Sequence, residues 1–157
     1  MAEVNMAKAN EVFETLCSML DHKGWHYEKR DDLSIKSGVK SEDFPIDFVM
    51  RVNPKNQLVS FISCLPFQIN EEKRLDVALA ICVANYGMVD GSFDYDITDG
   101  TIFFRLTSSY RDSVLSENLF EYMLVVAAAT VDAYNDKFFM ISKGMLSLQQ
   151  FIESENE

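Results

Sequence analysis

The dipeptide Asp99-Gly100 stands between two stretches of alternating apolar residues, and this arrangement constrains the fold because it predicts a β-hairpin. Pairing outward from a two-residue turn gives three apolar pairs on one face: Ile97–Ile102, Tyr95–Phe104 and Phe93–Leu106. The same register sets Asp94 opposite Arg105 on the other face. Because turn chemistry, alternation and charge pairing agree, residues 90–107 are predicted to form a hairpin with one buried face.

A second hairpin is predicted over residues 44–64. Apolar side chains occupy every second position from 44 to 52, and the segment 53–56 (Asn-Pro-Lys-Asn) is typical of a turn. The next strand then runs from Gln57 to about Cys64, and the sequence 64–67, which contains Pro66, is expected to end its pairing. A four-residue turn gives these core pairs: Phe48–Phe61 and Met50–Val59.

The other face of this second hairpin is too apolar to be simply solvated. It carries Asp47 and Arg51, but these three apolar residues share it: Val49, Leu58 and Ile62. Such a face needs a cover from the same chain or from a partner. We therefore predict Val49, Leu58 and Ile62 as partner-binding residues.

Helical patterns flank the hairpins. A helix is predicted over 3–23, ending at Gly24, and weaker strands are predicted at 25–27 and 33–38. Asn70 can cap a helix whose segment 75–84 is apolar almost all round, which indicates burial on most sides. Ser116 can cap a third helix, interrupted near 135–136 and continuing over 137–152, with a frayed tail at about 153–157.

The order of elements is α-β-β-β-β-α-β-β-α, which indicates an α+β fold with a mainly antiparallel sheet of about six strands. With 157 residues, of which 48% are hydrophobic, the chain is expected to form one domain over 1–157. Its formal net charge of −11 argues against nucleic-acid binding, because phosphates attract a basic surface. No apolar run of about 18 residues predicts a membrane span, and no secretory signal is recognisable, so a cytoplasmic location is expected.

Motifs for catalysis or metal binding are not found in the sequence. His22 and His26 are separated by a predicted helix end, and the acidic residues from 90 to 99 do not have the spacing of a calcium loop. No nucleophile elbow or glycine-rich phosphate loop occurs. We predict no enzyme activity, no metal and no cofactor. The three cysteines have apolar neighbours and are predicted to be buried free thiols.

Several turn and packing motifs carry a resemblance to a known family. They are Phe44-Pro-Ile-Asp-Phe, Leu65-Pro-Phe, Asn70-Glu-Glu-Lys-Arg, Ala84-Asn-Tyr-Gly, Gly91-Ser-Phe-Asp-Tyr-Asp and Asp99-Gly-Thr-Ile-Phe-Phe-Arg. With these motifs the chain resembles the YbjN family, described as bacterial sensory transduction regulators, over about residues 10–145. The resemblance implies a fold similar to type III secretion chaperones, with helices packed on a twisted antiparallel sheet. It carries no catalytic residues to transfer.

Two functions are compatible with these observations. The first is a non-enzymatic protein-interaction module, a chaperone-like adaptor or regulator. By resemblance to secretion chaperones it would form a homodimer and bind extended segments of a protein partner. The acidic charge favours basic or amphipathic partners. The alternative is a small-molecule-sensing domain with a pocket between sheet and helices, lined by Phe48, Phe61, Tyr95 and Phe104.

Overall fold

A six-stranded antiparallel sheet with helices packed on it forms the computed structural model, which describes residues 4–156. The strands are β1 (Tyr27–Asp31), β2 (Ser34–Val39), β3 (Ile46–Asn53), β4 (Leu58–Gln68), β5 (Ser92–Asp96) and β6 (Thr101–Ser109), in the sheet order β1-β2-β3-β4-β6-β5. The helices are α1 (Met6–Lys23), α2 (Arg74–Gly87), α3 (Glu117–Ser142) and α4 (Leu148–Glu155), with a short 3-10 helix over Glu71–Lys73 before α2. The predicted α+β class and antiparallel sheet are confirmed.

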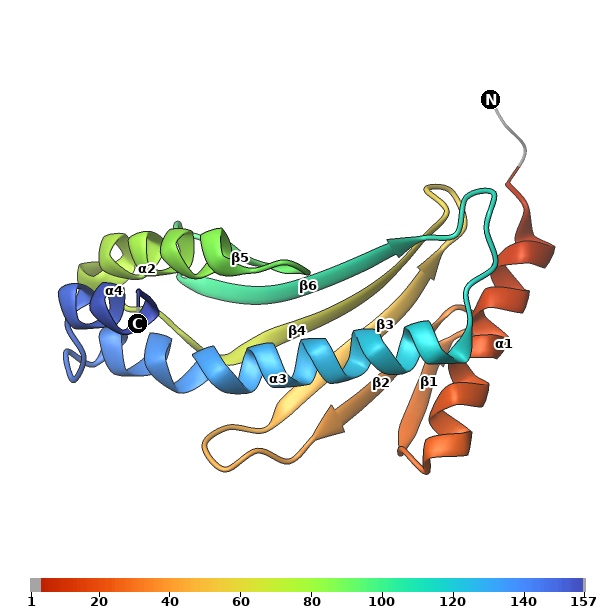
Figure 1. Cartoon of the computed structure of the whole chain (residues 1–157), viewed down its shortest axis with the longest axis horizontal. Helices are drawn as coiled ribbons and strands as arrows, with labels where there is room; N and C mark the ends of the chain where they lie inside the picture. Colours follow the sequence, from red (N-terminus) through yellow and green to blue (C-terminus); the bar gives the residue numbers. More distant parts are fainter. Residues whose placement is uncertain (1–3, 157) are drawn as a thin grey trace.

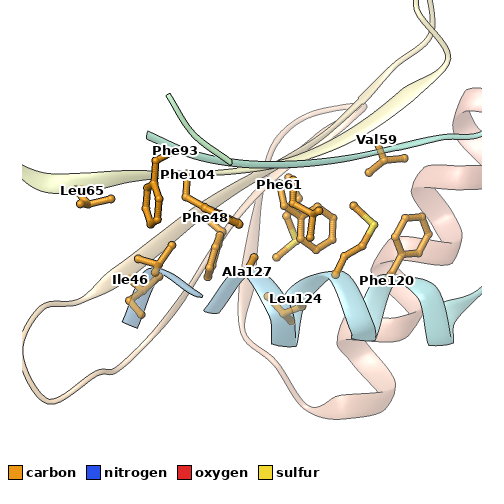
Figure 2. Packing of buried hydrophobic residues seen from close by; sticks show 14 of the residues in the cluster. Ile46, Phe48, Val59, Phe61, Leu65, Phe93, Phe104, Phe120, Leu124 and Ala127 are labelled. Carbon is orange, nitrogen blue, oxygen red and sulfur yellow. The ribbon is translucent and has the colours of Figure 1, made fainter. Parts of the chain in front are cut away.

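Helix α3 runs along one face of the sheet, with α1 at one end of it and α2 and α4 at the other (Figure 1). The side chains between α3 and the strands form the core. Figure 2 shows Phe48, Phe61 and Phe104 of the sheet facing Leu124 and Ala127 of α3. The Phe61 ring also stacks on Phe120, with centroids 6.4 Å apart. All of these residues are buried, so the face predicted to be the core is the face that α3 covers.

The hairpin of β3 and β4 has the predicted core face but a different register. Met50 pairs with Phe61 and Val52 with Val59, two positions from the predicted pairing. The turn occupies residues 54–57 because Gln57 adopts a positive φ of 55° and leaves the strand. A shift of two residues keeps every side chain on its own face, which is why the core assignment holds despite the wrong pairs. Strand β4 also continues beyond Pro66, and only its regular pairing with β6 is interrupted, between Cys64 and Gln68.

The β5–β6 hairpin differs from the prediction in the same way. Phe93 pairs with Phe104 and Tyr95 with Ile102, so the turn has four residues, 97–100. Ile97 therefore lies in the turn, exposed, and not on the core face. The longer turn is stabilised because the Asp96 side chain accepts hydrogen bonds from the backbone and hydroxyl of Thr98.

Two helical segments and the first strand depart from the sequence prediction. Helix α3 continues without interruption through Asn135 to Ser142, and the break comes at Gly144, where φ is +70°. The first strand begins at Tyr27 and not at Trp25. Asn70 precedes the 3-10 helix without capping it, since its side chain accepts a hydrogen bond from Ser142 instead. Ser116 caps α3 as predicted, accepting from the Leu119 backbone.

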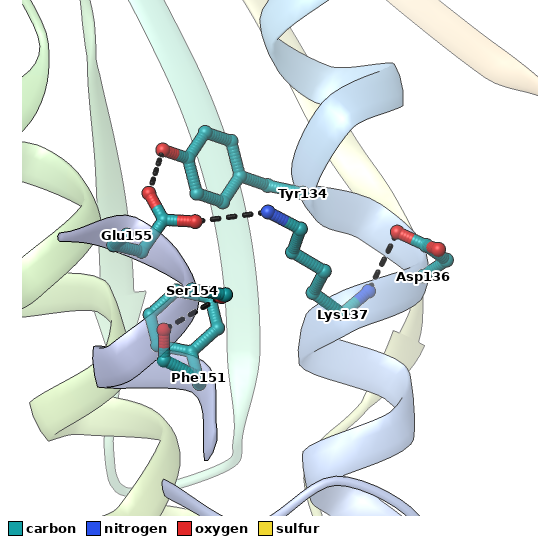
Figure 3. Close-up of polar contacts among 6 residues, drawn as sticks. All are labelled: Tyr134, Asp136, Lys137, Phe151, Ser154 and Glu155. Atoms are coloured by element: carbon teal, nitrogen blue, oxygen red, sulfur yellow. Dashed lines mark hydrogen bonds and ion pairs between the residues drawn. The ribbon is translucent and has the colours of Figure 1, made fainter. Parts of the chain in front are cut away.

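Helix α4 is fastened to α3 by the side chain of Glu155. The Tyr134 hydroxyl donates to Glu155 Oε2 at 2.5 Å and Lys137 Nζ donates to Oε1 at 2.9 Å (Figure 3). Phe151 is fully buried and its ring lies 6.1 Å from that of Phe138. The helix therefore extends into the segment expected to be frayed. Burial acts to raise the pKa of Glu155, but the hydrogen bonds from Lys137 and Tyr134 outweigh it and lower that pKa.

We predict that Gly100→Ala destabilises the protein by about 2 kcal/mol or more. Gly100 has φ +82°, and a Cβ there would overlap the backbone of Ile69, whose N–H donates to the Gly100 carbonyl. The control is Gly87→Ala at the end of α2, where a Cβ meets nothing within 4 Å and should stabilise by up to about 1 kcal/mol. Chemical denaturation measures both, and an equal effect of the two substitutions would contradict the close approach at Gly100.

We also predict that Glu155→Gln lowers stability at neutral pH by about 1 kcal/mol, since it replaces a carboxylate that accepts from Lys137 and Tyr134. Because the folded pKa of Glu155 is depressed, its stabilisation is present above the ordinary pKa of 4.5 and is lost as the pH falls through the folded pKa. The variant should therefore lose less stability than the wild type on acidification. Glu153→Gln, on an exposed position of α4, serves as control and should follow the wild-type pH profile.

Candidate protein-binding surface

The face of the sheet opposite α3 remains open. Outward-facing residues of β3, β4 and β6 are all exposed or partly exposed, so no element among residues 4–156 covers them fully. Val49 and Ile62 are cross-strand neighbours on this face. Phe103 of β6 lies on the same face and pairs with Cys64 of β4. Arg105, two residues further along β6, pairs with Ile62. We call Val49, Leu58, Ile62 and Phe103, each partly exposed, the outer-face cluster.

The structure brings together only two of the three predicted residues. Leu58 pairs with Asn53 at the turn end of the β3–β4 hairpin. It lies four positions along β4 from Ile62, or roughly 13 Å at the rise of an extended strand. Phe103 was not predicted, although the alternation that sets Arg105 outward on β6 also sets Phe103 outward. The apolar centre of the face is therefore Val49, Ile62 and Phe103, with Leu58 at its border.

Charges of both signs surround this apolar centre. Arg105 Nε lies 2.8 Å from Asp94 Oδ2, and Lys36 Nζ lies 3.8 Å from Asp47 Oδ2. The predicted Asp94–Arg105 ion pair is thus formed, although Asp94 lies opposite Phe103 and reaches Arg105 diagonally. Pairs this exposed contribute at most about 1 kcal/mol to stability. Their main effect is to give the outer face a mixed local charge within an acidic chain.

Two of the three cysteines are exposed, contrary to the sequence prediction. Cys17 of α1 is buried, Cys64 lies on the outer face, and Cys82 lies on α2. Apolar sequence neighbours misled the prediction because in a strand or helix adjacent residues point to different faces. Partial burial, followed by the charge of Asp99, raises the pKa of the Cys64 thiol.

Helix α2 presents a second apolar surface. The sequence predicted burial on most sides, but only one side of the helix is buried, by Val77, Ala80, Ile81 and Ala84. The opposite side carries Leu75, Leu79, Cys82 and Tyr86, which we call the α2 stripe. Leu75 is 70% exposed, Leu79 55% and Tyr86 96%. Composition alone could not distinguish a fully buried helix from one with an apolar outer side.

Three of the four residues predicted to line a small-molecule pocket lie in the buried core. Phe48, Phe61 and Phe104 are fully buried in the core, and Tyr95 donates from its hydroxyl to the Arg74 carbonyl. A hollow of about 450 Å³ lies elsewhere, between α1 and the β1–β2 turn, and its lining is mostly polar: Asn10, Phe13, Glu14, Lys29, Arg30, Asp31 and Asp32.

Titratable side chains do not converge on a reactive centre in the part of the chain that the structure describes. His22 contacts Glu117 at 2.8 Å at the junction of α1 and α3, and this hydrogen bond raises its pKa. Burial raises the pKa of Tyr27 and of Tyr134 to about 12, at separate places in the fold. Between residues 4 and 156, no three His, Cys, Asp or Glu side chains gather as metal ligands would. Over the same residues, no helix has both the length and the apolar character needed to cross a membrane.

Comparison with known proteins places the chain in a sequence family and a fold. The family described as "YbjN: Putative bacterial sensory transduction regulator" matches residues 13–140. A search of curated protein sequences finds no match. Among solved structures, one similar chain comes from "Crystal structure of YbjN, a putative transcription regulator from E. coli". It is 13% identical, with a TM-score of 0.57, over 77% of this chain and 86% of that one.

A second similar structure is titled "Structure of the HopA1-SchA Chaperone-Effector Complex". One of its chains is 11% identical, with a TM-score of 0.55, over 85% of this chain and 99% of that one. At such low identity both structures show the shared fold. The fold that the resemblance implied is therefore confirmed.

Thiol labelling tests the two open surfaces. In dilute native protein, a maleimide reagent should modify Cys64 and Cys82, whereas Cys17 should react only after unfolding. Because the pKa of Cys64 is raised, its labelling rate should continue to increase at alkaline pH. Single Cys→Ser variants identify each site by mass spectrometry. Protection of Cys64 in the dilute protein would contradict an open outer face.

Proposed function

The chain belongs to the YbjN family, and on this premise we propose that it is a non-enzymatic protein-interaction module, a chaperone-like adaptor or regulator. The observation that carries the proposal is the outer-face cluster, an apolar centre on an open sheet face. Apolar side chains in such a position gain free energy when a partner removes them from water, at about 25 cal/mol per Å². A solved structure with the same fold is titled as a chaperone–effector complex, which supports a protein as the partner.

We propose that the outer face also mediates self-association. A two-fold symmetric contact sets the same surface against itself, so it requires charges that do not repel across the axis. The outer face meets this requirement because Arg105 and Lys36 lie there with Asp94 and Asp47. A sheet face with a small apolar centre fits a moderate, reversible dimer better than an obligate one.

The triple variant V49T/L58S/I62T tests the proposal. Threonine keeps the β-branched shape at Val49 and Ile62, so the strands should form normally while the surface becomes polar. We expect self-association, measured by analytical ultracentrifugation, to weaken about tenfold. The amount of partner recovered from a native extract after mild cross-linking should fall in parallel, with an unchanged melting temperature.

The matched control is V114S/V125S, which also removes exposed apolar side chains but lies in the loop before α3 and on α3 itself. It should leave both association and recovery unchanged. If the triple variant and the wild type associate equally and recover the same partners, the outer face is not the interaction surface.

A further inference from the structure

Opposite charges line the hollow between α1 and the β1–β2 turn without pairing with one another. Lys29 and Arg30 of β1 border the hollow. Glu14 of α1 and Asp32 of the turn border it as well. The ion pairs formed among residues 4–156 include none of these four side chains. Charges of both signs around the hollow are therefore left for a ligand to contact.

A bulge in β1 brings two adjacent cations to the same hollow. In a regular strand, Lys29 and Arg30 would point to opposite faces of the sheet. The pairing of β1 with β2 shifts between Lys29 and Asp31, and Arg30 has no partner residue in β2. A bulge of this kind redirects a side chain, and both cations line the hollow. Charges that only protected the sheet edge would not need to converge in this way.

Contacts within the chain hold two of the charged side chains in place. Lys29 Nζ lies 5.7 Å from the centroid of the Phe13 ring, in a cation–π contact with a buried side chain. At the end of β1, Asp31 Oδ1 accepts a hydrogen bond from the backbone N–H of Leu33 at 2.9 Å. A ligand therefore meets charges that are already positioned, so its binding loses less free energy to the ordering of side chains.

The lining of the hollow restricts the chemistry of the ligand. The volume of about 450 Å³ is typical of small-molecule sites. Two cations disfavour a purely cationic ligand, and three carboxylates, with Asp31 included, repel a ligand rich in phosphate. An apolar ligand would find only Phe13, which Lys29 already covers. A small molecule with one positive and one negative group can contact charges of both signs at once.

We propose that this hollow binds a free amino acid with a neutral side chain. The α-carboxylate of the ligand contacts Lys29 and Arg30, and its α-ammonium group contacts Glu14 and Asp32. Asn10, one helical turn before Glu14 on α1, supplies an amide for a polar side chain of the ligand. This site goes beyond the proposed function, because it requires neither the outer-face cluster nor a protein partner.

The test uses L-glutamine, a zwitterion with a neutral polar side chain, and the isotope-labelled full chain. The titration is followed through the backbone amide shifts of the protein in NMR spectra. We expect saturable shifts centred on residues 10–14 and 29–32, with a Kd of about 1 mM, because the ligand is small and polar. Absence of saturable shifts at a concentration roughly twentyfold above this Kd would overturn the proposal.

Two derivatives of glutamine remove one charge each. N-acetyl-L-glutamine keeps only the carboxylate, and L-glutamine α-amide keeps only the ammonium group. Both should bind at least about tenfold more weakly than glutamine, since each loses the hydrogen bonds of one charged group. Residues inside a protein chain carry neither group, so this result also distinguishes a free amino acid from a peptide segment. Equal binding of either derivative would contradict the proposal.

Protein variants assign the two contacts. K29M keeps an apolar stem over Phe13 but removes the ammonium group, so it should weaken glutamine binding about tenfold and leave the α-amide derivative nearly unaffected. E14Q should weaken glutamine binding and leave the N-acetyl derivative nearly unaffected. K55M, at an exposed position of the β3–β4 turn, should bind like the wild type. R30Q tests the carboxylate contact a second time if K29M disturbs β1. Wild-type affinity for glutamine in K29M, R30Q and E14Q would show that the ligand does not bind in this hollow.

Discussion

Helix α3 lies across the middle strands of the sheet, and its contact with β4 through Phe120 and Phe61 anchors the rest of the molecule. Burial of one large aromatic side chain stabilises the folded state by about 1.5–3 kcal/mol. Phe48, Phe61 and Phe104 all point to the face that α3 covers. The same helix also contacts α1 and α2. Its Tyr134, Lys137 and Phe138 side chains contact α4.

Covering one face so completely leaves the other without a helix. In an antiparallel sheet with one uncovered face, that face is usually polar. Its side chains meet water, while the alternate side chains pack into the core. Here Val49, Ile62 and Phe103 break that pattern at neighbouring positions on three strands. None of the three belongs to the buried core. Contact with another molecule is the simplest physical use of such a group.

Both edge strands of the sheet are protected against pairing with a further strand. At β5, the Asn85 amide occupies the backbone N–H and carbonyl of Phe93, as a neighbouring strand would. At β1, the edge carries four consecutive exposed charged residues, Glu28, Lys29, Arg30 and Asp31. Charged edge strands resist pairing with other chains. The open surfaces are therefore side-chain surfaces, the outer sheet face and the α2 stripe, and not backbone ones.

Local pattern predicted the core faces of the two hairpins and the helix cap at Ser116, because alternation and capping depend on residues close in sequence. Local pattern did not determine the cross-strand pairing, and both hairpins are shifted by two residues. Gln57 and Ile97 belong to the turns, which are stabilised by hydrogen bonds that the backbone N–H groups of Tyr110 and Thr98 donate. It found Val49 and Ile62 because a strand face can be deduced by counting. Local pattern could not show which side of α2 is exposed to water, because leucines at 75 and 79 are equally compatible with a helix that is buried on all sides. Only the tertiary structure, by setting Val77 and Ala84 against the core, decided that the α2 stripe faces outward.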